Sequence, residues 1–310
     1  MTTRQHSVTF ITTKSGTKRT RIITLAFLAA FTLAGCGGGE DGLNSDSMIL
    51  LPTTWDESAP STQTWQPSTT TSTVSGQAAT LYVFPLSLHQ NGTFSSYVSK
   101  VGTTTTVKYS VSGRITTTTV ANGTFAGRYE SATLYKPSVL FEGTSVTPAE
   151  STGKYSSVTI NGIAQKDSTS SSVSYYDTTF GVRLGNQSEG VYKVLDTNRS
   201  QGFPGLAISG DTGDFFIYNV YSDSTKKSFI GRDVYSYTVK SVSASSSIEY
   251  LATVDFIVRK YNGSGVLTQV TTTTQELLYN ANSGSKSRTL SIVVDDVAGT
   301  TTSRLTFTRI

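Results

Sequence analysis

The sequence predicts an all-β protein, made of antiparallel up-and-down meanders that form a β-barrel or a sandwich, in one body or two lobes. Three observations predict this fold class. Beyond residue 78 the chain is rich in Thr, Ser, Tyr, Val and Phe, which suit a half-buried pleated surface. Asn-Gly, which readily supplies the positive φ angles of tight hairpin turns, recurs at 91, 122, 161 and 262. The same region shows no apolar stripe at helical spacing.

The first element is a secretory signal over residues 1–35. Its basic residues are Arg4, Lys14, Lys18, Arg19 and Arg21, and the apolar stretch IITLAFLAAFTLAG follows them. A basic start, a short apolar run and small residues at its end are typical of a cleaved signal peptide. The run is shorter than the roughly 20 apolar residues that span a bilayer. An uncleaved anchor helix is therefore the alternative interpretation.

The single cysteine of the chain, Cys36, comes directly after this run. Leu33, Ala34, Gly35 and Cys36 resemble the lipobox of bacterial lipoproteins. The resemblance implies that the Cys36 thiol receives a diacylglycerol, that cleavage makes Cys36 the first mature residue, and that its amine is often acylated too. Two or more acyl chains hold a protein stably on a bilayer, so Cys36 would anchor the chain. A lone reduced or reactive thiol is the other interpretation.

The charge of the mature chain argues against a basic-protein function. The whole chain has a formal charge of +4, but five of its 25 basic residues lie in the signal, which leaves 20 against 21 acidic ones and a net charge of −1. The longest basic runs are pairs such as Lys226-Lys227 and Arg259-Lys260. We therefore expect no nucleic-acid partner. The expected partners are the membrane, through the lipid, and a protein or glycan ligand of unknown identity.

Residues 36–77 are predicted to form the lipidated cysteine and a flexible tether. This stretch is rich in Gly, Ser, Thr and Pro and contains five acids but no Lys or Arg. Such a composition buries too little apolar surface to order itself. SMILLPTTW at 47–55 and Trp65 interrupt it, so residues 47–65 either float or dock on the body. A docked segment would act as an extra strand or a plug.

The body divides in the sequence into an N-terminal β lobe over 78–200 and a C-terminal β-meander lobe over 201–310. QGFPGLAISGDTGD at 201–214 either separates two lobes or forms one long connection in a single larger barrel. In the C-terminal part, strands are predicted near 232–242, 247–260, 265–279, 287–296 and 302–309. Alternation predicts three sets of residues that each share one face: Ala252, Val254, Phe256 and Val258; Leu290, Ile292 and Val294; Leu305 and Phe307.

Two fragments of the body, LSLHQNGTF and ANGTFAGRY, resemble the strand-turn-strand pieces of lipocalin-like and other small-barrel bacterial lipoproteins. A β body on a Gly-rich lipid tether is also similar to the handle-and-barrel surface lipoproteins typified by transferrin-binding proteins. Both resemblances imply a fold, and fold does not set function.

Candidate catalytic residues are few. Asp211, Thr212 and Gly213 form the D-T-G signature of aspartic proteases, but those enzymes need two such aspartates, and no second D-T-G or D-S-G exists. Asp214 also stands where that family has Ser or Thr. We therefore predict a polar turn at this motif. His89, the one histidine that remains after signal cleavage, is predicted to be solvated or capping beside a hairpin turn.

Metal and ligand signals are equally sparse. The nearest calcium candidates are Asp211 with Asp214 and the pair Asp295-Asp296, and neither fits a calcium-binding loop, so we expect solvated turn or strand-end acids. The tyrosines are expected to be barrel or sandwich residues, with sugar stacking or a protein interface as the alternative. The most informative of them are Tyr175, Tyr176, Tyr218, Tyr221, Tyr235 and Tyr237.

The sequence thus predicts a lipid-anchored protein of the outer membrane or cell surface, modified at Cys36, with a non-enzymatic binding or structural role. We expect no catalytic, cofactor-binding or metal-binding residue. Gly37 follows the cysteine where many inner-membrane lipoproteins have Asp, and this favours the outer membrane. The alternative function is that of an envelope polysaccharide or peptide hydrolase, which would use carboxylates that the sequence does not pair.

Overall fold

The structure is a computed structural model that describes residues 56–57, 69–74, 77–86, 101–116, 120, 122–178, 182–188, 190–202, 204–282, 284–297 and 302–309. The described residues form strands, turns and connections, and every strand pairing is antiparallel. The predicted all-β, antiparallel fold class is therefore confirmed.

Twelve antiparallel strands close into one barrel. In chain order, the barrel strands are β4 (Thr104–Thr116), β5 (Gly123–Tyr135), β7 (Thr144–Ile160), β9 (Ser168–Asp177), β10 (Arg183–Ser188), β11 (Val191–Leu195), β12 (Thr212–Tyr221), β13 (Phe229–Ser246), β14 (Glu249–Asn262), β15 (Leu267–Asn280), β16 (Gly284–Asp296) and β17 (Thr302–Arg309). Each pairs with the next strand of this series. Closure comes from β17, which pairs with β16 on one side and with β4 on the other.

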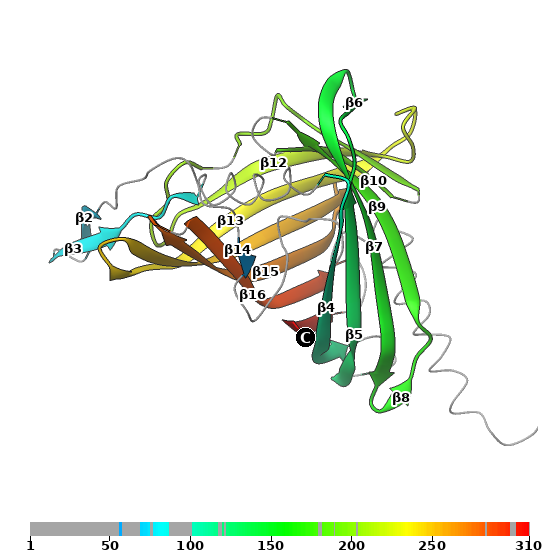
Figure 1. Ribbon diagram of the computed structural model, residues 1–310, viewed down its shortest axis with the longest axis horizontal. Coiled ribbons are helices and arrows are strands. Elements are labelled where there is room, and N and C mark those ends of the chain that lie inside the picture. Colours follow the sequence, from blue (N-terminus) through cyan, green and yellow to red (C-terminus); the bar gives the residue numbers. More distant parts are fainter. Residues whose placement is uncertain are drawn as a thin grey trace, which may run out of the picture.

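Two groups of strands cross each other in this barrel. In Figure 1, β4, β5, β7 and β9 run steeply, whereas β12 to β16 run nearly across them. The two shortest barrel strands, β10 with 6 residues and β11 with 5, join the groups. Short strands of this kind form the corner at which two orthogonal sheets meet. The predicted boundary between residues 200 and 201 falls just after this corner, in the connection between β11 and β12.

The C-terminal meander agrees with the prediction except in one detail. The strands β13 to β17 coincide with the five predicted strands, and Ala252, Val254, Phe256 and Val258 are all buried as expected. Leu290 does not share the buried face of Ile292, because it is 38% exposed. The reason is a β-bulge in β16: Thr274 and Gln275 of β15 pair with Ser291 and Thr289, so Leu290 is the extra residue and its side chain turns outward. Thr289 is buried in its place.

Two apolar clusters fill much of the barrel interior. The first lies mainly on β12 to β15 and includes Phe216, Val239, Val254 and Leu277. The second lies on β4, β5, β7, β16 and β17 and includes Phe307 with a group of buried tyrosines, Tyr109, Tyr129 and Tyr155. Burial of these aromatic side chains supplies the main favourable contribution to folding, because hydrophobic stabilisation grows with the apolar area removed from water.

Residues 81–86, named here the plug segment, cover one end of the first cluster. Phe84 and Leu86 are completely buried in that cluster. Phe84 also exchanges two backbone hydrogen bonds with Ala207, of 2.8 and 2.9 Å, in the connection between β11 and β12. The plug segment therefore closes the end of the barrel at which β11 ends and β12 begins.

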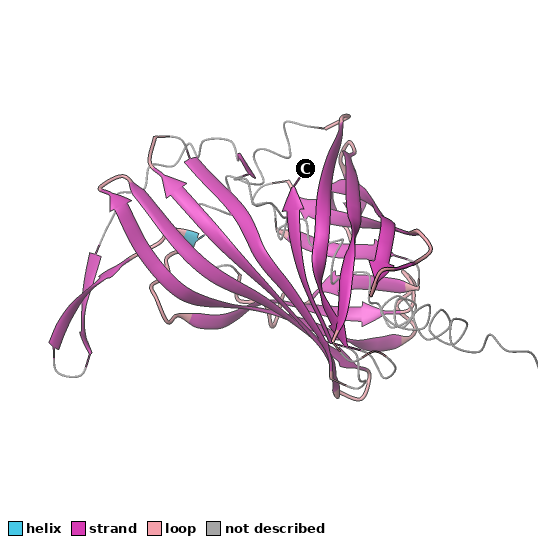
Figure 2. Cartoon of the chain, turned by 90° about the horizontal axis from the view of Figure 1, so that it is seen from below, coloured by secondary structure: helices cyan, strands magenta, loops and turns pink. Residues whose placement is uncertain are grey.

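Short accessory strands lie outside the barrel series. β1 (Asp56–Glu57) pairs with β16, so part of the 47–65 stretch docks as an extra strand, one of the two alternatives left open by the sequence. β2 (Thr69–Val74) and β3 (Gln77–Tyr82) form a hairpin that projects from the barrel in Figures 1 and 2, and β2 lies within the predicted tether. β6 (Val139–Phe141) and β8 (Ile163–Ala164) both pair with β7.

The predicted Asn-Gly turns have three outcomes. Asn161 and Gly162 have φ angles of 49° and 78° and form the tight turn between β7 and β8, as predicted. Asn122 has a φ of 52° immediately before β5, and Asn262 ends β14, where its side-chain Oδ1 accepts backbone N–H groups of the following turn. The Asn-Gly pair at 91 lies outside the described residues.

The β6–β7 hairpin packs on the outer wall at the corner of the barrel. The ring of Phe141 stacks on that of Tyr175, with centroids 4.2 Å apart, and contacts Tyr192. It also occupies the space that a side chain at residue 185 would need, because a Cβ built on Gly185 would lie 2.2 Å from Phe141 Cζ. At the hairpin turn, Glu142 accepts hydrogen bonds from Tyr192 Oη and from Lys226 Nζ of the β12–β13 loop.

Much of the rest of the outer wall is polar. Along β4, Lys108, Ser110, Ser112 and Arg114 are exposed, whereas the alternate residues Tyr109, Val111 and Ile115 are buried. Cross-strand ion pairs line this wall, with N–O distances of 3.3 Å for Lys108–Glu130, 3.2 Å for Lys136–Glu150 and 2.8 Å for Lys240–Asp255. The barrel is thus apolar on much of its inside and charged on its outside.

Candidate functional site in the barrel interior

Buried polar side chains lie between the two apolar clusters on both sides of the barrel. On one side they come from β9, β10 and β11, and on the other from β15 and β16. The buried members of this set are Ser172, Ser174, Asn186, Lys193, Thr271, Thr273, Gln275 and Thr289. Each lies at the inward-facing position of the alternating pattern of its strand.

A buried carboxylate, Asp233 of β13, forms the centre of this polar interior. Its Oδ2 lies 2.7 Å from Nζ of Lys193, and these two side chains are only 4% and 2% exposed. Lys260 of β14 stands directly opposite Asp233 in the sheet register and is also buried. Two lysines therefore share one carboxylate, and we name Lys193, Asp233 and Lys260 the buried triad.

The electrostatics of the buried triad reflect its removal from water. Burial lowers the pKa of Lys193 to about 8; nearby Asp233 opposes this effect and Lys260 adds to it. Burial lowers the pKa of Lys260 as well, again opposed by Asp233. Asp233 raises the pKa of both lysines, and Lys260 lowers the pKa of Lys193, so the three side chains lie close enough to interact electrostatically. With a pKa of about 8, Lys193 is mainly protonated at neutral pH.

A fourth buried charge, Arg183 at the start of β10, is held by two tyrosines. Its Nη2 donates to Oη of Tyr235 at 2.8 Å, and its guanidinium lies over the rings of Tyr218 and Tyr235 at 4.8 and 5.2 Å. Tyr218 in turn donates its hydroxyl to the backbone carbonyl of Arg183 at 2.7 Å. Burial raises the pKa of both tyrosines, so their hydroxyls stay protonated beside the guanidinium of Arg183.

Two further polar atoms complete the interior. Asn186 stands opposite Lys193 in the register of β10 and β11, and its Nδ2 donates to Ser174 Oγ at 3.2 Å. Its Oδ1 and the hydroxyl of Thr271 are buried without a hydrogen-bond partner in the described part of the chain. Thr271 lies on the strand that pairs with β14, two residues from the partner of Lys260. Buried polar atoms of this kind usually have a partner, which includes ordered water or a ligand.

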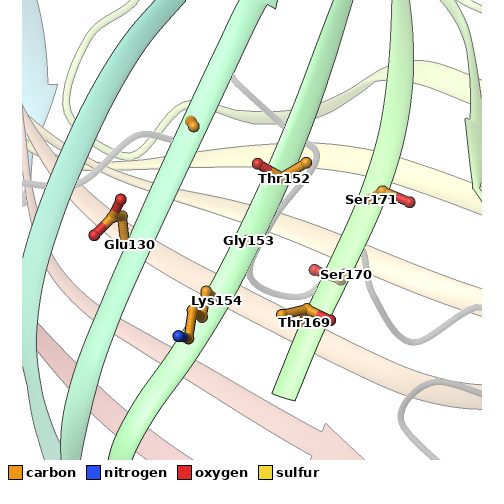
Figure 3. Close-up of a pocket in the computed structure, with 8 residues that line it drawn as sticks. Glu130, Thr152, Gly153, Lys154, Thr169, Ser170 and Ser171 are labelled. Carbon is orange, nitrogen blue, oxygen red and sulfur yellow. The ribbon is translucent and has the colours of Figure 1, made fainter. Parts of the chain in front are cut away.

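A separate hollow of about 540 Å³ lies on the outer wall over β5, β7 and β9. Figure 3 shows its lining, in which Glu130 and Lys154 lie on neighbouring strands among Thr and Ser side chains. Glu130 pairs with Lys108, and Lys154 pairs with Asp167 at 3.5 Å. The eight lining residues include no aromatic side chain, so the hollow offers hydroxyls and paired charges but no stacking surface.

Only the first residue of the D-T-G motif lies in a turn, because Thr212 and Gly213 already belong to β12. Asp211 Oδ2 accepts the backbone N–H of Ile208 at 2.9 Å, which closes the turn before β12. Thr212 begins β12 and donates its hydroxyl to the carbonyl of Tyr237 at 2.9 Å. Asp214 follows on β12, where it is exposed to solvent. Asp211 thus serves the backbone of its own turn.

The other predicted candidates lie apart from the buried triad or outside the described residues. Asp295 and Asp296 end β16, as expected for strand-end acids. Within the described ranges, no three His, Cys, Asp or Glu side chains come together as a metal site requires. Cys36 and His89 lie outside the described residues. The same part of the chain contains no helix with the length and apolarity of a membrane span.

The tyrosines that the sequence singles out lie on both faces of the barrel wall. Tyr176, Tyr218 and Tyr235 are buried in the interior, as predicted for barrel residues. Tyr175 and Tyr221 pack instead in the outer cluster around Phe141.

The residues of the buried triad were missed by sequence reasoning, although the sequence contains a signal for Lys260. The buried set at 252, 254, 256 and 258 continues at the same spacing to 260, so Lys260 occupies an inward position. In the sequence, Lys260 also forms a basic pair with Arg259. In the structure the two side chains point to opposite faces, and Arg259 binds Ser236 on the outer side.

Comparison of the chain with known proteins gave no match to any family model, to any curated protein or to any solved structure.

Proposed function

We propose that this chain is a bacterial envelope lipoprotein, tethered through lipid on Cys36, whose barrel stands in water and has a binding role without catalysis. The observation that carries the proposal is the distribution of polarity in the barrel wall. Lysine, arginine and carboxylate side chains pair across the outer face, as in Lys108–Glu130 and Lys240–Asp255, and the two main apolar clusters lie inside the barrel. A barrel that spans a membrane has the opposite arrangement, with an apolar band outside.

A polar outer wall leaves the lipid as the membrane attachment. The lipobox-like LAGC at 33–36 supplies the acceptor thiol, and the part of the tether that precedes β1 connects it to the body. Gly37 favours the outer membrane or the cell surface as the location. The barrel would thus be held near the membrane without entering it.

The environment of the carboxylates supports binding over hydrolysis. Glycoside and peptide hydrolases of the carboxylate type need two acids that converge on one substrate. Several of the described carboxylates bind a cation instead, for example Asp255 with Lys240, Glu276 with Arg288 and Glu142 with Lys226. Asp233, the buried acid, is paired with Lys193.

Cell fractionation tests the proposed anchoring. The wild-type chain is expected in the outer-membrane fraction, and the Cys36→Ala variant is expected as unprocessed precursor or as soluble protein. The comparison of the wild type with Cys36→Ala distinguishes two kinds of membrane attachment. A barrel that spans the bilayer would stay in the membrane after washing with alkaline carbonate, whether or not the cysteine is present. Ser47→Ala, a change in the tether, is the matched control and should fractionate like the wild type.

Retention of processed Cys36→Ala protein in the washed membrane would overturn the proposed lipid tether. Fractionation of the wild-type chain with the inner membrane would contradict the proposed location only.

A further inference from the structure

We infer that the hollow on the outer wall binds a neutral linear glycan, which lies across β5, β7 and β9 with one sugar ring at each strand. The inference names a ligand class and a place for the binding role proposed above, and it rests on that role. The site is separate from the buried triad, because the side chains that line it point away from the barrel interior.

The lining of the hollow is a regular array of outward side chains. Each of the three strands contributes two of them, and the sheet register aligns these pairs in two rows that run across the strands. The first row contains Ala132, Thr152 and Ser171, and the second row contains Glu130, Lys154 and Thr169. Neighbouring strands lie about 4.8 Å apart, so the contacts along each row repeat at that interval. The rings of a linear 1,4-linked glycan repeat at a similar interval, and such a chain can therefore follow the rows.

The difference in side-chain length between the two rows shapes the hollow. In Figure 3 the row with the short Thr152 and Ser171 side chains lies beside the row that contains the longer Glu130 and Lys154. The short row leaves space over the sheet, and the long side chains border it. The volume of about 540 Å³ falls within the roughly 300–1,000 Å³ that is usual for small-molecule sites.

The charges beside the hollow cancel in pairs. Glu130 binds Lys108 at 3.3 Å, and Lys154 binds Asp167 at 3.5 Å. The two ion pairs bring equal numbers of positive and negative groups, so an ionic ligand gains no net attraction from them. The same groups can still form hydrogen bonds to a ligand, because an ammonium has three N–H donors and a carboxylate has two acceptor oxygens. The electrostatics therefore favour a neutral polar ligand over an ion.

Hydroxyl side chains supply the remaining polar surface of the hollow. Thr152, Thr169 and Ser171 are all exposed to solvent. A hydroxyl group both donates and accepts hydrogen bonds, as the hydroxyls of a sugar do, so the two surfaces can pair in either direction. The lining residues include no aromatic ring for stacking, and the contacts therefore rest on hydrogen bonds. We expect weak binding that strengthens with each ring that reaches another strand.

Saturation-transfer NMR with N-acetylchitotriose, a neutral 1,4-linked trisaccharide, tests the inference, because the method detects weak binding. The full mature chain is purified in a nonionic detergent without a sugar headgroup. The trisaccharide should bind about tenfold more tightly than N-acetylglucosamine, since the two further rings add hydrogen bonds at two further strands. The affinity should be the same at low and high sodium chloride, because a neutral ligand has no charge to screen.

Two substitutions that fill the hollow should weaken this binding. Thr152→Arg places a long side chain at the centre of the first row, and Ser171→Arg places one at its end. Both positions are exposed, so both variants should fold like the wild type. Each should weaken trisaccharide binding by about tenfold or more, because the added side chain occupies the space of a sugar ring. Ser112→Arg, at an exposed position of β4 outside the hollow, adds the same charge and is the matched control; it should bind like the wild type.

An absence of trisaccharide binding by the wild-type chain would overturn the inference, and so would unchanged affinity in folded Thr152→Arg and Ser171→Arg. Loss of binding at high salt would also contradict it, because such a loss indicates an ionic contact. These outcomes leave the proposed lipid tether intact, since fractionation of the Cys36→Ala variant tests that tether without a glycan. Cleavage of the bound trisaccharide would support the site and contradict the proposed absence of catalysis.

Discussion

Lys193 Nζ and Asp233 Oδ2 lie 2.7 Å apart in the interior of the barrel, where at most 4% of either side chain is exposed. The two residues come from β11 and β13, and the strand between them, β12, contributes Val220 next to Lys193 in the register. A buried ion pair is costly to break from one side, because the remaining charge loses its partner. Here the two sides are unequal, since Lys260 also faces Asp233.

This inequality predicts different costs for the two single substitutions. Asp233→Leu leaves Lys193 and Lys260 without their shared carboxylate and should destabilise the barrel by about 3–5 kcal/mol. Lys193→Met leaves Asp233 beside Lys260 and should cost clearly less. Urea unfolding of the two variants in a nonionic detergent measures both losses of unfolding free energy. A larger loss for Lys193→Met than for Asp233→Leu would contradict the shared-carboxylate arrangement.

Stability should rise with pH from about 8 and fall again above about 10. Burial lowers the pKa of Lys193 to about 8, below the roughly 10.4 of an unfolded lysine, so the unfolded state binds more protons in this interval and stability increases with pH. Burial raises the pKa of Tyr235 and Tyr155, so above about 10 the unfolded tyrosines ionise first and stability decreases.

Thermal melts between pH 7 and pH 11 check this dependence. In Lys193→Met the rise above pH 8 should become smaller, while the fall above pH 10 should remain. A monotonic loss of stability from pH 7 upward in the wild type would show that the lysines are not desolvated as described.

The plug segment should contribute strongly to stability through Phe84. This side chain is completely buried in the first apolar cluster, and Phe84→Ala is expected to cost about 3–5 kcal/mol through lost burial and the cavity that remains. Leu206→Ala is the control, because Leu206 lies next to Ala207 in the same connection but is 54% exposed. Equal unfolding free energies for the two variants would mean that the plug segment does not hold the barrel closed.

Gly185→Ala should unseat the β6–β7 hairpin. The new Cβ would lie 2.2 Å from Phe141 Cζ and 2.5 Å from the backbone oxygen of Lys193, so the Phe141 ring must move. Overpacking of this kind costs about 1–3 kcal/mol. Gly205→Ala is the control, since a Cβ at Gly205 meets no atom within 4 Å. A double-mutant cycle with Phe141→Ala locates the effect, and additive costs would exclude a direct contact between residues 185 and 141.

The sequence predicts those parts of the fold that depend on local patterns. The alternation of Ala252, Val254, Phe256 and Val258 reports a half-buried strand directly, and five such strands in succession indicate a meander. The error at Leu290 arises because this residue is the extra residue of a bulge in β16, which reverses the face locally, and no local pattern in the run 287–296 indicates it.

The closure of the barrel and the buried triad depend on contacts between distant residues. β17 pairs with β4, so Thr302 faces Thr116, and no local pattern relates these two positions. The sequence accordingly leaves one barrel and two lobes as alternatives. Lys193 and Asp233 come together across β12 only because β11 to β13 follow one another around the wall. A lysine at an inward position of a strand is the signal that points to such a centre before the structure is known.

The lipid on Cys36 is the central claim, and mass spectrometry of the mature N-terminal peptide tests it most directly. The protein is purified from the membrane fraction in detergent, digested, and the first peptide is identified by its mass. We expect the mature chain to begin at Cys36 and to carry a diacylglyceryl thioether, with a further acyl chain on the amine where the host adds one. A membrane-bound chain that begins at another residue, or one that has a free Cys36 thiol, would contradict it.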